Sequence, residues 1–583
     1  MTKLPPPPNL PRSKEPLTLA AMLSIPVEFL IAGLLFLLLI VPLGMVVASG
    51  FMHEGSVSGY WFTRVLGNSV LMSQLGNSVL LAAATTGLCL LMGIPLAVLR
   101  VRCRFVGQGL LGLLVLAPMI LPPFVGALSL QHLASRFGSI NLLLERIGLL
   151  DFSQHLPPDW LGGGFAGVAA LQALHLFPIL YLNAAAALAN VDPCYSQAAR
   201  NLGAGPLRTF LRITLPLMAP GLFAGATLVF IWSFTDVGVP LMLDYQHLVP
   251  VTIFKELARA DTGGRTFCLV FVMLSSSITL YALGKFLFGR SAVGEASKAS
   301  IADQPRHLGL AGTLGAWLLM GGLAVLALAP HAGVVLMALS DRWVNTVLPT
   351  KYTLSHMAFV VTDPATYASI VNSLKYALAA TGIDVVLGIA IAFLVVRIKV
   401  PLRGALDSLA MLPLAVPGLI LAAGYVALTA SGPLKSIGPM GNPFIILVVA
   451  YAVRRLPFMV RGASAGLTQV PPSLEEAARN LGASPASAAA RITLPLIAAN
   501  LIAAAVLTFA FSVLEVSDSL ILAQLPQHYP ITKQIFNLAT SAGSPETPRQ
   551  AAALGVYGMA MLGATMAAAA ALLGKRLGAI FRA

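Results

Sequence analysis

The stretch YSQAARNLGAGPLRTFLRITLPL at residues 195–217 returns as LEEAARNLGASPASAAARITLPL at residues 474–496. The two copies share 14 of 23 residues and are separated by 279 positions. A second repeat lies upstream, where NSVLLAAATTGLCLLMGIPLAVLRVR from Asn77 parallels NSLKYALAATGIDVVLGIAIAFLVVR from Asn372. The chain therefore contains the same unit twice, in the same direction.

The composition requires a lipid environment. Of 583 residues, 57% are hydrophobic and only 10% are charged, and the mean hydropathy is +0.85. A bilayer core about 30 Å thick needs roughly 20 apolar residues for each helical span. We therefore predict an all-α polytopic membrane protein with about twelve transmembrane helices, arranged as two parallel six-helix repeats. The predicted spans are 25–50, 75–100, 105–130, 163–190, 216–241, 266–289, 310–340, 371–396, 404–429, 442–468, 496–523 and 551–574.

The distribution of basic residues predicts the orientation. With a cytoplasmic N-terminus, the inward-facing segments hold 22 of the 36 Lys and Arg residues, the outward segments hold 12, and two lie within a span. Cytoplasmic loops of membrane proteins carry such an excess of positive charge. We therefore expect both termini in the cytoplasm. The charge recurs in short loops between apolar spans, which argues against a nucleic-acid partner.

The polar stretch SAVGEASKASIADQPRHL at 291–308 has the composition of a linker. It divides the chain into an N-terminal cytoplasmic tail at 1–24, a first membrane domain at 25–290, a cytoplasmic linker at 291–308 and a second membrane domain at 309–583.

A loop of small residues lies between the fourth and fifth predicted spans of each half. Alanine permits close approach of helices, glycine accepts backbone angles that other residues resist, and proline is tolerated in the first turn of a following helix. An ordinary helical hairpin is the simpler interpretation, but spacing, position and duplication favour a specialised loop. The defining residues are Gln197, Ala198, Ala199, Gly203, Leu215 and Pro216, and then Glu476, Ala477, Ala478, Gly482, Leu494 and Pro495.

These loops resemble the EAA loop of binding-protein-dependent ABC importer permeases. In that family the loop forms a short helix, a turn at the glycine and a second helix, and it docks into a groove on the ATPase subunit. The first copy departs from the family pattern, because Gln197 stands where glutamate is usual and where the second copy has Glu476. We therefore expect two unequal ATPase-coupling loops.

The resemblance covers nearly the whole chain, including APMILPPFVG at 117–126 and TDVG at 235–238. The chain is similar to the fused permeases of the ferric-iron group, whose relatives import thiamine, aminoethylphosphonate, sugar phosphates or polyamines. The resemblance implies two permease domains in the bacterial inner membrane. It also implies ABC ATPase subunits, two in number, and a periplasmic or lipid-anchored solute-binding protein as partners.

Catalytic signatures are missing from the sequence. There is no GxxxxGK[ST] phosphate-binding loop, no HExxH and no Ser-His-Asp signature. The cysteines show no metal-ligand spacing and are Cys89, Cys103, Cys194 and Cys268. We therefore expect a transport subunit that is not an enzyme and has no metal site or cofactor, with ATP and Mg bound by the separate ATPase.

Ionisable residues within spans mark a candidate substrate pathway, because burying charge in a membrane is costly. Asp236 and Glu515 occupy equivalent positions in the two halves. At 1.5 Å per residue, Asp236 lies about 30 Å from Pro216 along a helix, near the outer mouth. Alternatively, these acids and bases pair with one another or reach the interface. The candidates are Asp236, Glu515, Asp518, His175, Arg454 and Arg455.

The residues leave the cargo open. Carboxylates suit a cation such as hydrated ferric iron or a polyamine, whereas Arg454, Arg455 and His175 suit a phosphorylated anion. By resemblance we favour ferric iron, with a phosphonate, a sugar phosphate, thiamine or a polyamine as alternatives. An ion-coupled secondary transporter, with Asp236 and Glu515 as proton or sodium sites, is the alternative from another class.

Overall fold

The computed structural model describes residues 19–120, 122–152, 156–259, 263–288, 306–398, 400–414, 416–430, 432–541 and 544–573. Most of the predicted N-terminal tail and of the predicted linker lies outside these ranges. Almost all described elements are helices, where η marks a 3₁₀ or π segment. Three short two-stranded ladders complete the inventory: β1 (Met52–His53) with β2 (Ser56–Val57), β3 (Cys103–Arg104) with β4 (Arg306–His307), and β5 (Ser340–Arg342) with β6 (Lys351–Tyr352).

The helices follow the same order in the two halves. The first half contains α1 (Leu19–Leu35), η1 (Phe36–Ile40), α2 (Val41–Gly50), α3 (Tyr60–Leu66), α4 (Ser69–Arg102), α5 (Gln108–Leu116), η2 (Ala117–Ile120), α6 (Pro123–Ala134), α7 (Ser139–Arg146), η3 (Gly162–Gly164), α8 (Phe165–Ala189), α9 (Pro193–Asn201), α10 (Pro206–Thr209), η4 (Phe210–Thr214), α11 (Leu215–Thr235), α12 (Gly238–Met242), α13 (Val249–Ala258) and α14 (Gly264–Phe288). The second half contains α15 (Leu310–Ala316), η5 (Trp317–Gly321), α16 (Gly322–Leu339), α17 (Ser355–Thr362), α18 (Pro364–Ala392), η6 (Phe393–Ile398), α19 (Arg403–Met411), η7 (Leu412–Leu414), α20 (Gly418–Thr429), η8 (Pro433–Ile437), α21 (Phe444–Gln469), α22 (Ser473–Asn480), α23 (Pro485–Ala488), η9 (Ala489–Thr493), α24 (Leu494–Val513), α25 (Ser517–Leu522), η10 (Pro526–His528), α26 (Ile531–Thr540) and α27 (Thr547–Leu573).

The predicted spans correspond to helices. Within the described residues, eight helices are long and apolar enough to cross a membrane, or ten if each of two bent pairs is one span. The two remaining predicted spans are α14, whose apolar part is shorter, and α21, which carries three arginines. The chain is an all-α, multi-pass membrane protein.

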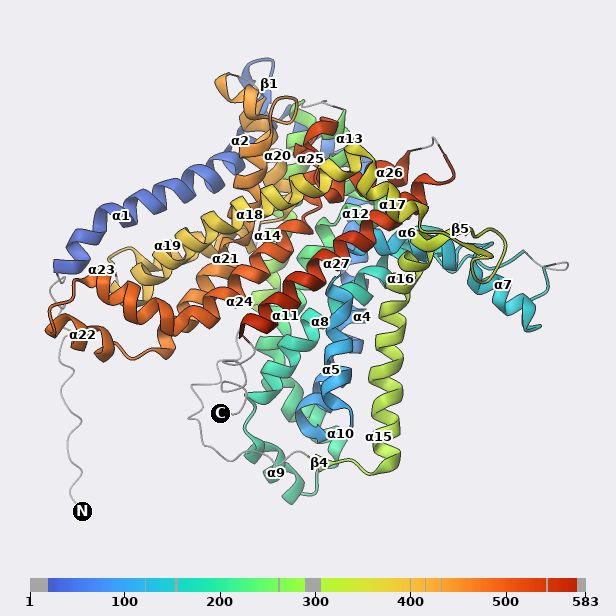
Figure 1. Cartoon of the computed structure of the whole chain (residues 1–583), viewed down its shortest axis with the longest axis horizontal. Coiled ribbons are helices and arrows are strands. Elements are labelled where there is room, and N and C mark those ends of the chain that lie inside the picture. Colours follow the sequence, from blue (N-terminus) through green and yellow to red (C-terminus); the bar gives the residue numbers. More distant parts are fainter. Residues whose placement is uncertain are drawn as a thin grey trace.

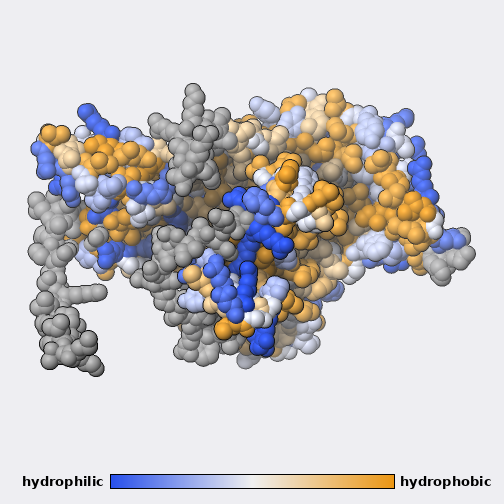
Figure 2. Space-filling model, turned by 90° about the horizontal axis from the view of Figure 1, so that it is seen from below, coloured by the Kyte–Doolittle hydropathy of each residue, from blue (hydrophilic) through white to orange (hydrophobic). Residues whose placement is uncertain are grey.

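Apolar side chains cover much of the outer surface. Leu30, Leu91 and Leu318 are 72%, 73% and 80% exposed, although each lies in a long apolar span. Seen from below, hydrophobic residues form broad patches and hydrophilic residues gather in separate bands (Figure 2). Such patches are unfavourable in water and fit contact with lipid tails.

The third and ninth predicted spans are each interrupted by a sharp bend. Gln108–Met119 and Pro123–Arg146 meet at 95°, and Arg403–Leu414 and Gly418–Thr429 meet at 102°. Pro122 and Pro417 stand at the bends. Proline removes a backbone donor and disfavours helix at the residue before it, so each span breaks. The fifth and eleventh spans also end earlier than predicted, at Thr235 and Val513.

Each half packs its first span on the other half. In Figure 1, α1 lies beside α19, and α16 lies beside α5 and α6. Ile31 and Leu35 of α1 share a hydrophobic cluster with Leu394 and Leu406 of the second half. The two sequence halves are therefore interleaved.

Polar contacts strengthen the packing of each first span on the opposite half. The Glu28 carboxylate accepts a bond of 2.9 Å from the backbone N–H of Leu402, just before α19. Conversely, the Trp317 indole donates a bond of 2.9 Å to the Val106 carbonyl, just before α5. In both cases the first span of one half bonds to the connection between the second and third spans of the other half. The two first spans are therefore packed in equivalent ways.

Candidate functional site

The two loops predicted from the repeat, here called the first loop (195–217) and the second loop (474–496), have the same backbone form. Gly203 and Gly482 have φ angles of +80° and +91°, a conformation that favours glycine. In the first loop, Ala204 N–H donates to Ala199 C=O at 3.0 Å, and Ala483 N–H donates to Ala478 C=O at the same distance. These bonds close the C-terminal ends of α9 and α22, so each loop is a helix, a glycine turn and a second helix.

The loops expose one face and bury the other. Ala199 and Ala478 are buried, whereas Leu202 and Leu481 are 88% and 89% exposed. The helix pairs α9–α10 and α22–α23 lie at the ends of two separate arms, away from α13 and α25 (Figure 1). Each arm therefore presents an exposed leucine beside its glycine turn, which is typical of a surface that binds a partner.

The second helix of each loop is longer than predicted. Pro206–Thr235 and Pro485–Val513 are continuous helices, so Pro216 and Pro495 do not begin new ones. A π-helical segment precedes each proline, η4 in the first loop and η9 in the second. The wider π turn accommodates the bond that proline cannot donate, and the loop is mechanically continuous with the fifth span.

The loops differ at a position that the sequence prediction did not single out. Gln197 and Glu476 are both exposed, and neither side chain forms a hydrogen bond or ion pair within the described residues. The preceding residue, Glu475, instead contacts Arg397 at 3.1 Å and accepts a bond of 2.7 Å from Thr493. Its counterpart is Ser196, whose buried hydroxyl has no hydrogen-bond partner in the described structure. Aligning the two loops at their offset of 279 places Ser196 opposite Glu475 and could have revealed this difference.

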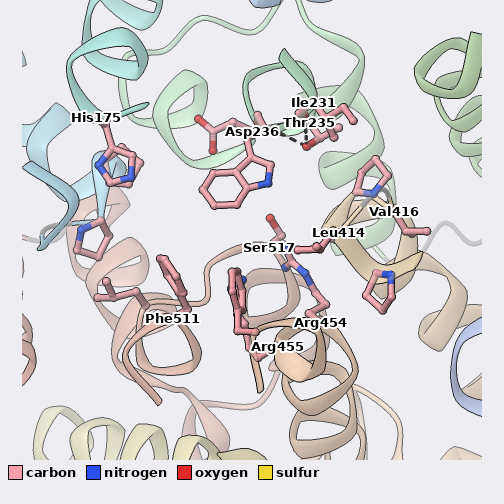
Figure 3. A pocket seen from close by; sticks show the side chains of 18 of the residues that line it. His175, Ile231, Thr235, Asp236, Leu414, Val416, Arg454, Arg455, Phe511 and Ser517 are labelled. Atoms are coloured by element: carbon pink, nitrogen blue, oxygen red, sulfur yellow. Dashed lines mark hydrogen bonds between the residues drawn. The ribbon is translucent and has the colours of Figure 1, made fainter. Parts of the chain in front are cut away.

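A cavity of about 170 Å³ lies between the two halves. Equivalent positions of the repeat line it from both sides. These pairs are Pro122 and Pro417, His175 and Arg454, and Trp232 and Phe511. Figure 3 shows His175 and Asp236 on one side of this cavity and Phe511, Arg454 and Arg455 on the other. The breaks in the third and ninth spans bring their prolines to the cavity wall.

The second half contributes a network of charges. Arg454 donates to Glu515 and, at 3.1 Å, to Asp518, and Arg455 donates to the other oxygen of Glu515. Glu515 and Asp518 are only 4% and 0% exposed. The Arg454 guanidinium lies against Gly418, where any larger residue would displace it. Two arginines thus line the cavity while their carboxylate partners lie behind them.

The first half has few charges at the same place. Asp236 follows α11 and accepts bonds from the Gln172 amide at 2.9 Å and from the backbone N–H groups of Gly238 and Val239 at 3.1 and 3.3 Å. Gln172 in turn accepts a bond of 2.6 Å from Ser233. Asp236 therefore accepts bonds from the first two backbone N–H groups of α12 and is held by neutral donors.

The structure separates the predicted pathway residues into two groups. Asp236, His175, Arg454 and Arg455 line the cavity, whereas Glu515 and Asp518 do not. Asp236 lies at the opposite end of α11 from the first loop, as the helix arithmetic predicted. Gln172 and Gly418, which orient the charged groups, were missed because their role depends on contacts between distant helices.

A smaller cavity of about 110 Å³ adjoins the first-half wall and is lined by Gln172, His175, Trp232, Ser233 and Asp236 among others. His175 Nδ1 lies 3.1 Å from the Pro118 carbonyl, which fixes the ring against the bend of the third span. Within the described residues, no group of three or more His, Cys, Asp or Glu side chains is placed to hold a metal ion.

Comparison with known proteins gives two matches within the chain. The family described as "Binding-protein-dependent transport system inner membrane component" matches residues 89–293 and again residues 384–581. The chain is 28% identical over 509 residues to a ferric transport system permease protein (FbpB 1) of Haemophilus influenzae, covering 84% of this chain and 77% of that protein.

Two further relatives bear on the comparison. The ferric transport system permease protein FbpB of Actinobacillus pleuropneumoniae is 27% identical, covering 83% of this chain and 69% of that protein. The molybdenum transport system permease protein ModB of Escherichia coli is 34% identical over 221 residues, which is 91% of its length but 35% of this chain. A relative of single-unit length thus matches one part of a chain that carries the unit twice.

Proposed function

Since this chain belongs to the family of binding-protein-dependent transport system inner membrane components, we propose that it forms the translocation pathway of an ATP-driven importer of ferric iron. The observation that carries the proposal is the pair of matching loops, each exposed at the end of an arm, combined with a cavity that both halves line. The names of the two FbpB relatives support the choice of iron.

Two ATPase subunits would bind the chain, one at each loop. Their ATP and Mg would be held by the partner, and the chain itself would contribute no catalytic group or cofactor. A periplasmic or lipid-anchored solute-binding protein would deliver cargo at the other end. The exposed Leu202 and Leu481 support docking at the loops, because each offers an apolar side chain to a groove. We place the protein in the inner membrane with both termini cytoplasmic, as the charge distribution favours.

The charges around the cavity support a cationic cargo. Arg454 and Arg455 are already neutralised by Glu515 and Asp518. Asp236, by contrast, is held by neutral donors, and its charge has no cationic partner among the described residues. The side chains of Asp236 and His175 are of a kind that iron accepts as ligands.

An oxyanion is the second candidate cargo. Arg454 and Arg455 both reach the cavity wall, and an anion that competed with Glu515 for them could bind there. The molybdenum permease relative also belongs to this importer class. A phosphonate or a sugar phosphate would use the same two arginines, whereas thiamine or a polyamine would use Asp236.

Reconstitution tests the proposal. The chain would be placed in proteoliposomes with its ATPase and the loaded binding protein, and uptake of radioactive iron would be measured with and without ATP. We expect accumulation that requires ATP and an intact ATPase site. Accumulation driven by a proton or sodium gradient without ATP would contradict the proposal and favour a secondary transporter. Uptake of phosphate esters in place of iron would keep the importer and change its cargo.

A further inference from the structure

The second loop is tied to the membrane helices by one acidic side chain. Glu475, in the first turn of α22, contacts Arg397 Nε at 3.1 Å and accepts a bond of 2.7 Å from the Thr493 hydroxyl. Arg397 also donates a bond of 2.7 Å to the Val470 carbonyl, just after α21. Arg397 and Glu475 are only 11% and 21% exposed. Solvent therefore screens their interaction less than it would a surface pair.

These contacts connect α22 to three separate helices. Arg397 lies in η6, which continues α18, while Val470 directly follows α21 and Thr493 directly precedes α24. α18, α21 and α24 pack on one another as one bundle. α21 carries Arg454 and Arg455, and α24 carries Phe511, all of which line the cavity. Glu475 therefore connects α22 to the helices that carry the cavity wall of the second half.

The first loop has the same partners without the acid. Arg102, Thr214 and Val191 stand at the positions of Arg397, Thr493 and Val470. The Arg102 guanidinium donates to Thr214 at a longer 3.5 Å. Ser196 replaces Glu475, and its side chain is too short to bridge the same groups. Arginine and threonine stand at the same positions in both halves, whereas the loop position between them is Ser196 in one and Glu475 in the other.

We propose that Glu475 is a positioning residue that holds the second loop rigidly on its bundle, so that the ATPase subunit docked there transmits its movement more tightly than the one at the first loop. This inference rests on the proposed ATPase docking. It differs from the inequality expected at Gln197 and Glu476, which concerns the exposed surface that a partner touches. Here the two loops differ in how firmly each is anchored to the helices beneath that surface.

The exchange of backbone amides tests the anchoring directly. Hydrogen–deuterium exchange of the intact chain in nanodiscs would be followed for peptides covering 471–484 and 192–205. We expect faster exchange in the first loop. Glu475→Ser should speed exchange in the second loop by about tenfold, the factor for losing a charge-assisted bond. Ser196→Glu should slow exchange in the first loop, because Arg102 and Thr214 are already in place.

Uptake per ATP hydrolysed tests the transmission. In the full importer, Glu475→Ser should lower this ratio by at least about fivefold. Glu475→Gln keeps the bond to Thr493 but loses the charge. Its uptake per ATP should therefore lie between those of the unmodified importer and Glu475→Ser. Ser196→Glu combined with Glu475→Ser should recover part of the ratio. Asp407→Asn is the matched control, because it removes a looser ion pair, 3.8 Å from Arg461, that involves no residue of either loop.

The outcomes separate the inference from the proposed function. If exchange in the second loop is the same in Glu475→Ser as in the unmodified chain, Glu475 does not anchor the loop and the inference is wrong. If exchange is faster but uptake per ATP is unchanged, the anchoring does not transmit movement and the inference is equally wrong. If the unmodified importer shows no ATP-driven uptake, the proposed function fails, while the exchange measurement still decides whether Glu475 anchors the loop.

Discussion

The two walls of the cavity occupy the same place in the repeat but use different chemistry. In the first half, Asp236 is held by Gln172 and two backbone amides. In the second half, Glu515 is held by two arginines. A neutral network can lose one member and keep most of its bonds, whereas a buried ionic network that loses one member leaves a charge uncompensated. We therefore expect the second wall to tolerate substitution less well than the first.

The largest effect is expected from Glu515→Gln. This change leaves Arg454 and Arg455 with Asp518 as their remaining acidic partner in the network, and breaking a buried pair in this way costs about 3–5 kcal/mol. Thermal denaturation of the purified chain in detergent would measure it. Asp236→Asn is the matched change in the first half and should cost about 1 kcal/mol, as for a helix cap. Equal losses would show that the walls do not differ.

A smaller effect is expected from Gly418→Ala. The added methyl group would collide with the Arg454 guanidinium and move it from Glu515 and Asp518, at a cost of about 1–3 kcal/mol. The same stability assay would detect the loss. Gly404→Ala is a suitable control, because nothing lies within 4 Å of the position of its new methyl group. If Gly418→Ala is as stable as this control, Gly418 does not determine where Arg454 lies.

The comparison extends to the loops through Gly482→Val. Its φ of +91° strains any β-branched residue, by about 1–3 kcal/mol. We expect ATPase activity stimulated by the loaded binding protein to fall while insertion into the membrane is retained. Gly203→Val imposes the same strain at φ +80° on the less firmly anchored first loop, where we expect a smaller loss of stimulation. A larger loss at Gly203 would reverse the proposed ranking of the loops.

The smallest expected effect is stabilising. Asp384 is fully buried in α18, and neither carboxylate oxygen has a hydrogen-bond partner among the described residues, whereas its first-half counterpart is Cys89. Asp384→Cys places the first-half residue there and removes an unpartnered buried carboxyl group, so it should raise stability by about 1 kcal/mol. The denaturation midpoint would show the change. A lower midpoint would indicate that the charge of Asp384 supports the neighbouring arginines.

Local patterns predicted much of this structure. Apolar runs of about 20 residues located the spans, and the repeated glycines located both loop turns, because each depends on short-range chemistry. The ion network was left open, since Arg454 and Glu515 are 61 positions apart and hydropathy does not state which helices touch. The anchoring by Glu475 was missed for the same reason. The packing of the first span was also unpredictable, because a uniformly apolar helix shows no preference between lipid and either half.

Because the first span of each half packs on the other half, the units that can move as one body do not coincide with the two halves of the sequence. α1 contacts α18, η6 and α19, and Glu28 joins it to Leu402. If the cavity opens by rotation of one bundle against the other, α1 turns with helices encoded more than 300 positions later in the chain. A spin label on α1 and another on α19 would then keep a fixed separation throughout the transport cycle. Labels on α1 and α4, although these helices belong to consecutive spans of the chain, would report the full rotation of one bundle against the other.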